Sequence, residues 1–308
     1  MRLPVVSLRA ITKRRLVRRL AVIPAIMCVM WLAVSSAVAY RLTHRRGAWA
    51  EEVAPSPAWG RLEEHRLKTR DGEEVGAWYN DGRPDAASVL VLHARKGNRG
   101  RSLGRAEILA AEGYAVLMLT LRAHGDSTGE LDDAGFGARH DVIAGVDFLA
   151  LRRPGRPVIV DGRSMGAAAA IFAAGELGHR VRGYILESPY QDLRGAVWNR
   201  VEEALPPVMD LAAYVGLNLV APVFLPHLDE ISPMTAIADI PADVPVLILA
   251  GEADRMARPD EARALHEKVA SHARLVFFPG AGHGDLLRAA PDLYTRNVLD
   301  FCRSVGGH

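Results

Sequence analysis

The stretch Val158–Ala168 reads VIVDGRSMGAA, in which three apolar residues lead into the pattern Gly-x-Ser-x-Gly and then into a run of alanines. We predict a short buried strand, a sharp turn at Ser164 and a helix that begins directly after it. Gly162 and Gly166 carry no side chains that would collide where strand and helix approach each other. The turn would place the serine hydroxyl above the sheet, where it could act as a nucleophile. The alternative is an ordinary strand-to-helix turn.

Short apolar runs on both sides of this stretch predict the other strands of the same sheet. The first two, Glu63–Thr69 and Glu74–Asn80, partly alternate in polarity around Asp71-Gly72 and predict a hairpin. The later runs are apolar throughout, which suits parallel strands covered by helices on both faces. These runs are Val89–Leu92, Ala115–Leu119, Tyr184–Leu186, Val244–Ala250 and Leu275–Phe278. Helical patterns over 142–150, 260–271 and 292–303 separate or follow them. The fold class is therefore α/β, a mostly parallel, doubly wound sheet with an antiparallel start.

A serine nucleophile needs a base and a carboxylate that orients the base. Two loops that follow predicted strands supply them. Asp254 comes after Val244–Ala250, and His283, flanked by glycines, comes after Leu275–Phe278. The carboxyl ends of parallel strands meet at one edge of a sheet, and the order serine, acid, histidine is the one expected of this motif. Glu187 and Glu252 are the alternatives for the carboxylate.

The formal net charge of +2 conceals a division of the chain. Residues 1–50 hold ten basic and no acidic residues, which leaves 28 basic against 36 acidic residues in 51–308, a net charge of −8. Between them, Leu20–Tyr40 is a run of 21 residues without charge, long enough for a helix to cross a bilayer. Seven basic residues precede this run, so the positive-inside rule favours a cytoplasmic N-terminus and an extracytoplasmic remainder.

We therefore divide the chain into a basic segment (1–19), a membrane helix (20–40), a linker (41–60) and a catalytic domain (61–308). A cleaved signal peptide is the alternative for the second part. Ala37-Val38-Ala39 has the form of a cleavage site, and cleavage would release a secreted or periplasmic protein.

Within the domain, residues 196–230 interrupt the alternation of strands and helices with an apolar segment that contains prolines and Asp210. We interpret this insertion as a helical lid over the carboxyl edge of the sheet, with a second membrane span as the alternative.

Other classes of site lack support. The two cysteines provide neither a disulfide framework nor a cysteine-based metal site. No nucleotide or metal motif is present, so we expect no cofactor and no metal. The acidic body argues against nucleic acid as a partner. We interpret the basic run Arg95, Lys96, Arg99 and Arg101 as solvated surface, with attraction of an anionic substrate as the alternative.

Segments between Val89 and Leu287 resemble the α/β-hydrolase superfamily, and in particular its membrane-anchored BEM46-like branch. These segments are LHARKGNRG, LRAHGDSTG, DGRSMG, LESPYQDL, DEISPM, ILAGEADR and GAGHGDLL. The resemblance implies an α/β-hydrolase fold with Ser164, Asp254 and His283 as catalytic residues. It also implies an oxyanion hole made by the backbone N–H groups of Met165 and of the loop after His93. Related proteins usually have glycine after that histidine, whereas this chain has Ala94, and we assign the second donor to Arg95.

The expected function is that of a membrane-anchored serine hydrolase. We expect it to cleave acyl esters or thioesters of small-molecule or lipid-like substrates through an acyl-enzyme intermediate. A serine peptidase of the prolyl-oligopeptidase-like type is the first alternative, because it would use the same three residues. A non-catalytic membrane interaction module is the second alternative, and an intact set of three catalytic residues counts against it.

Overall fold

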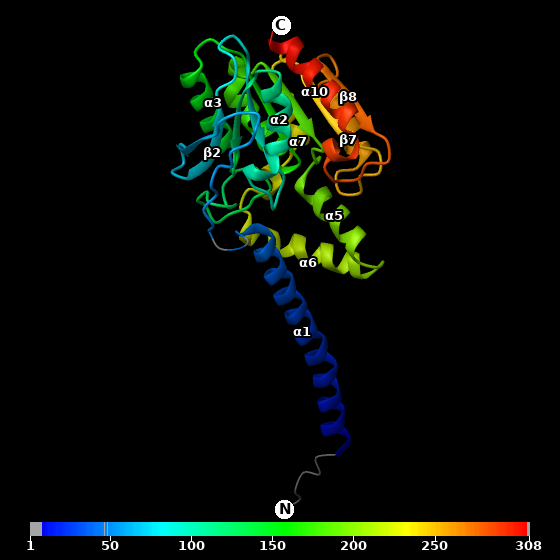
Figure 1. Ribbon diagram of the computed structural model, residues 1–308. Helices are drawn as coiled ribbons and strands as arrows, with labels where there is room; N and C mark the ends of the chain where they lie inside the picture. Colours follow the sequence, from blue (N-terminus) through cyan, green and yellow to red (C-terminus); the bar gives the residue numbers. More distant parts are fainter. Residues whose placement is uncertain (1–7, 46, 48, 307–308) are drawn as a thin grey trace, which may run out of the picture.

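A computed structural model describes residues 8–45, 47 and 49–306, and places eight strands in one sheet (Figure 1). The strand order is β1-β2-β4-β3-β5-β6-β7-β8, in which β2 is antiparallel to both its neighbours and all other pairs are parallel. The strands are β1 (Glu63–Lys68), β2 (Glu74–Asn80), β3 (Ser88–Leu92), β4 (Ala115–Leu119), β5 (Val158–Arg163), β6 (Gly183–Glu187), β7 (Val246–Gly251) and β8 (Ala273–Phe278). Strand β5 lies between β3 and β6, so the serine that follows it stands inside the carboxyl edge rather than at a margin of the sheet.

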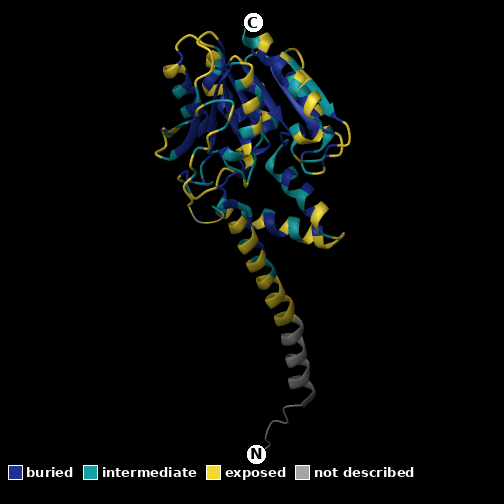
Figure 2. Ribbon diagram, in the orientation of Figure 1, coloured by how far each residue is buried: buried dark blue, intermediate teal, exposed yellow. Residues whose placement is uncertain are grey.

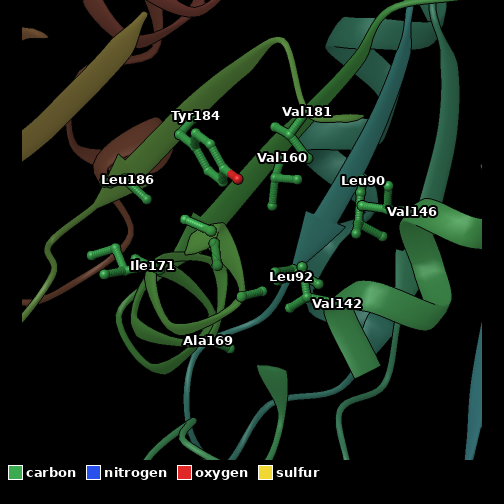
Figure 3. Packing of buried hydrophobic residues seen from close by; sticks show 14 of the residues in the cluster. Leu90, Leu92, Val142, Val146, Val160, Ala169, Ile171, Val181, Tyr184 and Leu186 are labelled. Carbon is green, nitrogen blue, oxygen red and sulfur yellow. The ribbon is translucent and has the colours of Figure 1, made fainter. Parts of the chain in front are cut away.

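Helices cover both faces of the sheet, as the uniformly apolar strands require. On one face, α3 (Arg139–Arg152), α4 (Met165–Leu177) and α8 (Pro259–Lys268) pack on alternate strand residues such as Leu90 and Val160. Figure 3 shows these two residues beside Val142 and Ala169. On the other face, α2 (Leu103–Ala111), α9 (Leu286–Ala289) and α10 (Pro291–Gly306) pack on the intervening strand residues. Successive strand residues thus enter two separate cores.

The predicted strands are confirmed, with small shifts at their ends. The opening hairpin pairs Glu63 with Tyr79 and Lys68 with Glu74. Strand β7 begins at Val246 instead of Val244, because the intervening Pro245 has no N–H to donate to a neighbouring strand. The helix predicted over 260–271 ends at Lys268, and the helix predicted over 292–303 is the longer α10.

The N-terminal apolar run forms helix α1 (Leu8–Thr43), which projects from the domain in Figure 1. Its 23 residues Ala21–Thr43 are long and apolar enough to cross a membrane by length and composition. The side chains of this part are mostly exposed (Figure 2). A helix covers the predicted residues 20–40, but it begins earlier, at Leu8 within the predicted basic segment, and ends three residues later, at Thr43. Residues 1–7 of the basic segment lie outside the described part of the chain.

The segment predicted as a linker is bound to the domain instead. The Arg45 guanidinium donates hydrogen bonds to the carbonyl oxygens of Gly125 and Gly129, each at 3.1 Å. The Trp49 indole donates to the carbonyl oxygen of Asp126 at 2.7 Å. Because these bonds fix the chain directly after α1, the orientation of the helix is coupled to that of the domain.

The insertion at 196–230 forms α5 (Leu193–Ala204) and α6 (Met209–Phe224), which precede the short helix α7 (Pro233–Ala236). Residues before and after α6, including Ala196 and Leu225, pack with Ala168 and Ala257 near the carboxyl edge of the sheet. Helix α6 itself leaves the sheet and packs on α1 (Figure 1). The insertion is therefore helical, as predicted, but the prediction that it lies over the carboxyl edge of the sheet is wrong for its longest helix, α6, which lies on α1.

Candidate active site

Ser164 lies at the turn between β5 and α4 in a strained backbone conformation, with φ 50° and ψ −109°. Its N–H donates to the Glu187 carbonyl oxygen of β6 at 2.7 Å, which holds the turn against the neighbouring strand. A Cβ atom on Gly162 would lie 2.5 Å from the Gly166 carbonyl oxygen, and one on Gly166 would lie 2.7 Å from the Leu92 carbonyl oxygen. Both positions therefore exclude any side chain, as the sequence pattern predicted. Strain of this kind persists only where its surroundings fix the backbone.

The structure brings Ser164, His283 and Asp254 together from three separate loops. The Ser164 Oγ lies 3.0 Å from His283 Nε2, and His283 Nδ1 lies 2.8 Å from Asp254 Oδ2. The Asp254 side chain is 0% exposed and that of His283 is 19% exposed. The second carboxylate oxygen, Asp254 Oδ1, accepts hydrogen bonds from the N–H groups of Met256 at 2.8 Å and Ala257 at 2.9 Å. The carboxylate is thus held on both oxygens.

This chain of hydrogen bonds selects one tautomer of the histidine. An ionised carboxylate can only accept, so His283 Nδ1 donates to Asp254 and Nε2 keeps its lone pair for the serine proton. The two alternative carboxylates are placed differently. The Glu187 carboxylate binds Arg105, and Glu252 is exposed on the loop. Of the three acids, the one in contact with the imidazole is Asp254.

The loop after β3, to which we assigned an oxyanion donor, is held in place by a buried histidine. His93 Nε2 accepts from the Leu121 N–H at 3.0 Å, and Nδ1 donates to the Ala94 carbonyl oxygen at 2.8 Å. Burial lowers the pKa of His93 to about 3, so the ring stays neutral and keeps both bonds. The Arg95 side chain donates to Asp132 at 2.7 Å, while Met165 begins α4 beside Ser164. The roles of the Met165 and Arg95 N–H groups remain predictions.

The basic run that we interpreted as solvated surface is partly buried, so that interpretation is wrong for Arg99. Its guanidinium is enclosed, donates to both oxygens of Asp126 at 2.5 and 2.7 Å, and lies over the Trp78 ring. The Asp126 carboxylate compensates the buried charge and makes the ion pair bidentate. Arg99 therefore anchors the loop after β4 and does not face solvent or substrate.

A buried ionic cluster behind the site was missed by the sequence analysis. Arg105 of α2 donates to both oxygens of Glu187 at 2.7 and 2.6 Å, and to Asp285 at 3.0 Å. Tyr294 donates its hydroxyl to Glu187. Asp161 of β5 is buried beside them, and burial together with the charge of Glu187 raises its pKa well above the usual range. The available signal was the presence of acidic residues within or directly after strands that are otherwise apolar.

We expect Arg105→Met to lower the free energy of unfolding by about 3–5 kcal/mol, because it leaves the buried Glu187 carboxylate without its cation. The exposed pair of Arg303 with Glu112 provides a matched control, since Arg303→Met should destabilise the protein far less than Arg105→Met does. Denaturant unfolding of the two variants measures both values. Equal destabilisation by the two substitutions would contradict a structural role for the Arg105 cluster.

A cavity of about 420 Å³ borders Asp254 between α5 and α8. Its lining is mostly charged and includes Glu202, Glu203, Arg255 and Arg258. Such a lining does not suit an acyl chain. The cavity lies beside the acid and not at the nucleophile, so we assign it no substrate.

A mostly parallel sheet with a strained serine at the turn after an inner strand defines the class of α/β hydrolases. Comparisons with known proteins agree with this fold class. A family model described as serine aminopeptidase, S33, matches residues 83–235. The protein bem46 of Schizosaccharomyces pombe is 24% identical over 82% of this chain and 81% of its own length. An uncharacterized membrane protein of Saccharomyces cerevisiae is 25% identical over 78% of this chain and 79% of its length.

Among solved structures, the esterase Pf2001 of Pyrococcus furiosus superposes with a TM-score of 0.68 at 22% identity, over 85% of this chain and 97% of the esterase. The chain therefore has the α/β-hydrolase fold. The predicted resemblance, including that to bem46, is confirmed.

Proposed function

We propose that this protein is a membrane-anchored serine hydrolase that cleaves acyl esters or thioesters. The observation that carries the proposal is the hydrogen-bonded series from Ser164 Oγ through His283 to the buried carboxylate of Asp254. Each link has the separation required for proton transfer or for orientation of the base. The similarity to a known esterase fold supports the reaction class.

The geometry suits the following reaction. His283 Nε2 accepts the serine proton as Ser164 Oγ attacks the acyl carbonyl carbon, and Asp254 stabilises the resulting imidazolium. The N–H groups of Met165 and Arg95 would bind the developing oxyanion. The imidazolium then donates its proton to the leaving alcohol or thiol. Water, deprotonated by His283, then attacks the carbonyl carbon of the acyl-enzyme. As the bond from this carbon to Ser164 Oγ breaks, the imidazolium donates its proton to Oγ, and the carboxylic acid is released.

Helix α1 would provide the anchor, with the catalytic domain on the extracytoplasmic side. Its apolar length, together with the basic residues that precede it, supports this orientation. The similarity to a yeast relative named as a membrane protein also supports anchoring.

The family model supports a second candidate, because its description names a serine aminopeptidase. A panel of esters of increasing chain length, acyl thioesters and peptides, assayed with the full-length protein, separates the two. We expect turnover of esters or thioesters and none of peptides. Cleavage of peptides alone would replace our proposal by the peptidase, and absence of any labelling by a fluorophosphonate probe would overturn both.

A further inference from the structure

Helix α6 exposes only apolar side chains. Between residues 206 and 223, all of which the structure describes, the exposed residues are Pro206, Pro207, Val208, Met209, Leu211, Ala212, Val215, Leu219, Pro222 and Val223. Leu219 is 61% exposed and Val223 is 78% exposed. The surface helix α8 behaves differently, since its exposed residues are Asp260, Arg263, Glu267 and Lys268. A cluster of exposed apolar side chains along one helix indicates a site of interaction.

The polar groups of α6 are turned away from this surface. Asp210 is buried. The Asn218 side-chain oxygen accepts a hydrogen bond from Arg194 of α5 at 2.6 Å. The Tyr214 ring packs edge-on against Trp198 of α5, with ring centroids 5.2 Å apart. The polar side chains of the helix are therefore buried or face α5, and the exposed surface carries no charge.

Contacts with α1 fix where this apolar surface lies. The Trp31 indole donates to the Ala212 carbonyl oxygen at 3.1 Å, and Ser35 packs on Gly216. Near the other end of α6, the ring of Phe224 lies 6.2 Å from that of Tyr40. At 1.5 Å per residue, the contacted part of α1 from residue 31 to residue 40 spans about 14 Å. All of it belongs to the stretch Ala21–Thr43 that is apolar enough to cross a membrane.

We propose that the exposed face of α6, from Val208 to Val223, is embedded in the outer half of the bilayer that α1 crosses. This inference rests on the proposed membrane crossing by α1. If α1 crosses, a helix bound to residues 31–40 lies at the depth of lipid chains, where an uncharged apolar face is favourable. A helix of 16 residues is about 24 Å long and too short to cross on its own.

The placement also sets the position of the catalytic domain. Helix α5 connects α6 with the site, because Asn199 donates to the Met256 carbonyl oxygen, two residues from Asp254. Figure 1 shows α5 and α6 on the side of the sheet from which α1 departs, with the end of α10 at the opposite side. An embedded α6 would hold the carboxyl edge of the sheet close to the membrane surface, within reach of acyl lipids in that leaflet.

Lipid quenching of a fluorophore on α6 tests the proposal with the full-length chain. In a Cys28→Ser background, single cysteines replace Leu219, Val223, Val34 or Leu151 and are labelled with a nitrobenzoxadiazole dye. Cys302 is buried and should not react. Val34 of α1 is the control for a position inside the bilayer. Leu151 of α3, which is 83% exposed, is the control for a position in aqueous solvent. The proteins are placed in phosphatidylcholine vesicles with or without doxyl-labelled lipid.

We expect doxyl lipid to quench the dye at positions 219 and 223 at least twofold, as at position 34, and to leave position 151 unchanged. Quenching at 34 without quenching at 219 and 223 would overturn the inference and leave the anchor intact. Absence of quenching at 34 would overturn the proposed anchoring, and this inference with it. A blue-shifted but unquenched signal at 219 and 223 would indicate burial against a second copy, which also overturns it. Two positions are used so that one misfolded variant does not decide the result.

Discussion

Ser164→Ala is expected to lower kcat for ester hydrolysis by about 10³–10⁶-fold and to abolish covalent labelling by a fluorophosphonate. The substitution removes the hydroxyl oxygen that lies 3.0 Å from His283 Nε2. The imidazole could then activate water alone, without an acyl-enzyme. Steady-state kinetics and gel detection of a fluorescent probe measure the two effects. The folded structure should persist, because alanine adds no atoms at a position where the backbone is already strained.

Ser188→Ala is the matched control. Ser188 also follows a strand of the sheet, has a positive φ of 45° and is buried, but within the described chain its hydroxyl has no hydrogen-bond partner. We expect activity and labelling within twofold of the unaltered protein. If probe labelling survived in Ser164→Ala, the nucleophile would have to be assigned to another residue.

Asp254→Asn is expected to lower kcat by about 10⁴-fold with little change in the fold. The reason is the tautomer of His283. Asp254 Oδ1 accepts two backbone N–H bonds, so the asparagine oxygen would occupy that position and direct its NH₂ group at His283 Nδ1. The imidazole would then carry its proton on Nε2, where it cannot accept one from Ser164. The loss should appear in kcat and in probe labelling rate, whereas the melting temperature should change little.

Glu252→Gln, on the same loop but exposed, should leave the rate within twofold. A loss as large as that of Asp254→Asn would show that the orienting carboxylate had been assigned to the wrong residue. Retained activity in Asp254→Asn together with a loss of activity in Glu252→Gln would assign the orienting carboxylate to Glu252 instead of Asp254.

Most of the sheet could be predicted from the sequence because its strands are short, uniformly apolar and bounded by glycine, proline or acidic residues. The positions of Ser164, Asp254 and His283 could also be predicted, since each follows such a strand and parallel strands end at one edge. Periodicity and the close approach that glycine allows are local properties, so they are encoded within a few residues of each element.

Pairings between distant residues could not be predicted in this way. No local feature of the sequence indicates that Arg99 pairs with Asp126 or that Arg105 binds Glu187. The same holds for Arg45, which donates to carbonyl oxygens 80 and 84 residues away. A charged side chain is predicted to be exposed to solvent as long as its partner is unknown. The reason is that burial of an ion is favourable only when a specific counter-ion compensates the lost hydration.

The sequence by itself was sufficient to predict an α/β-hydrolase fold, a helix of membrane-spanning length before it, and three candidate catalytic residues. Only the tertiary structure decided which carboxylate touches the imidazole, and that α6 lies along α1 instead of over the sheet. The physical reason is that apolar periodicity determines which face of an element is buried. The partner on which that face packs depends on the shapes and contacts of two elements that are distant in sequence.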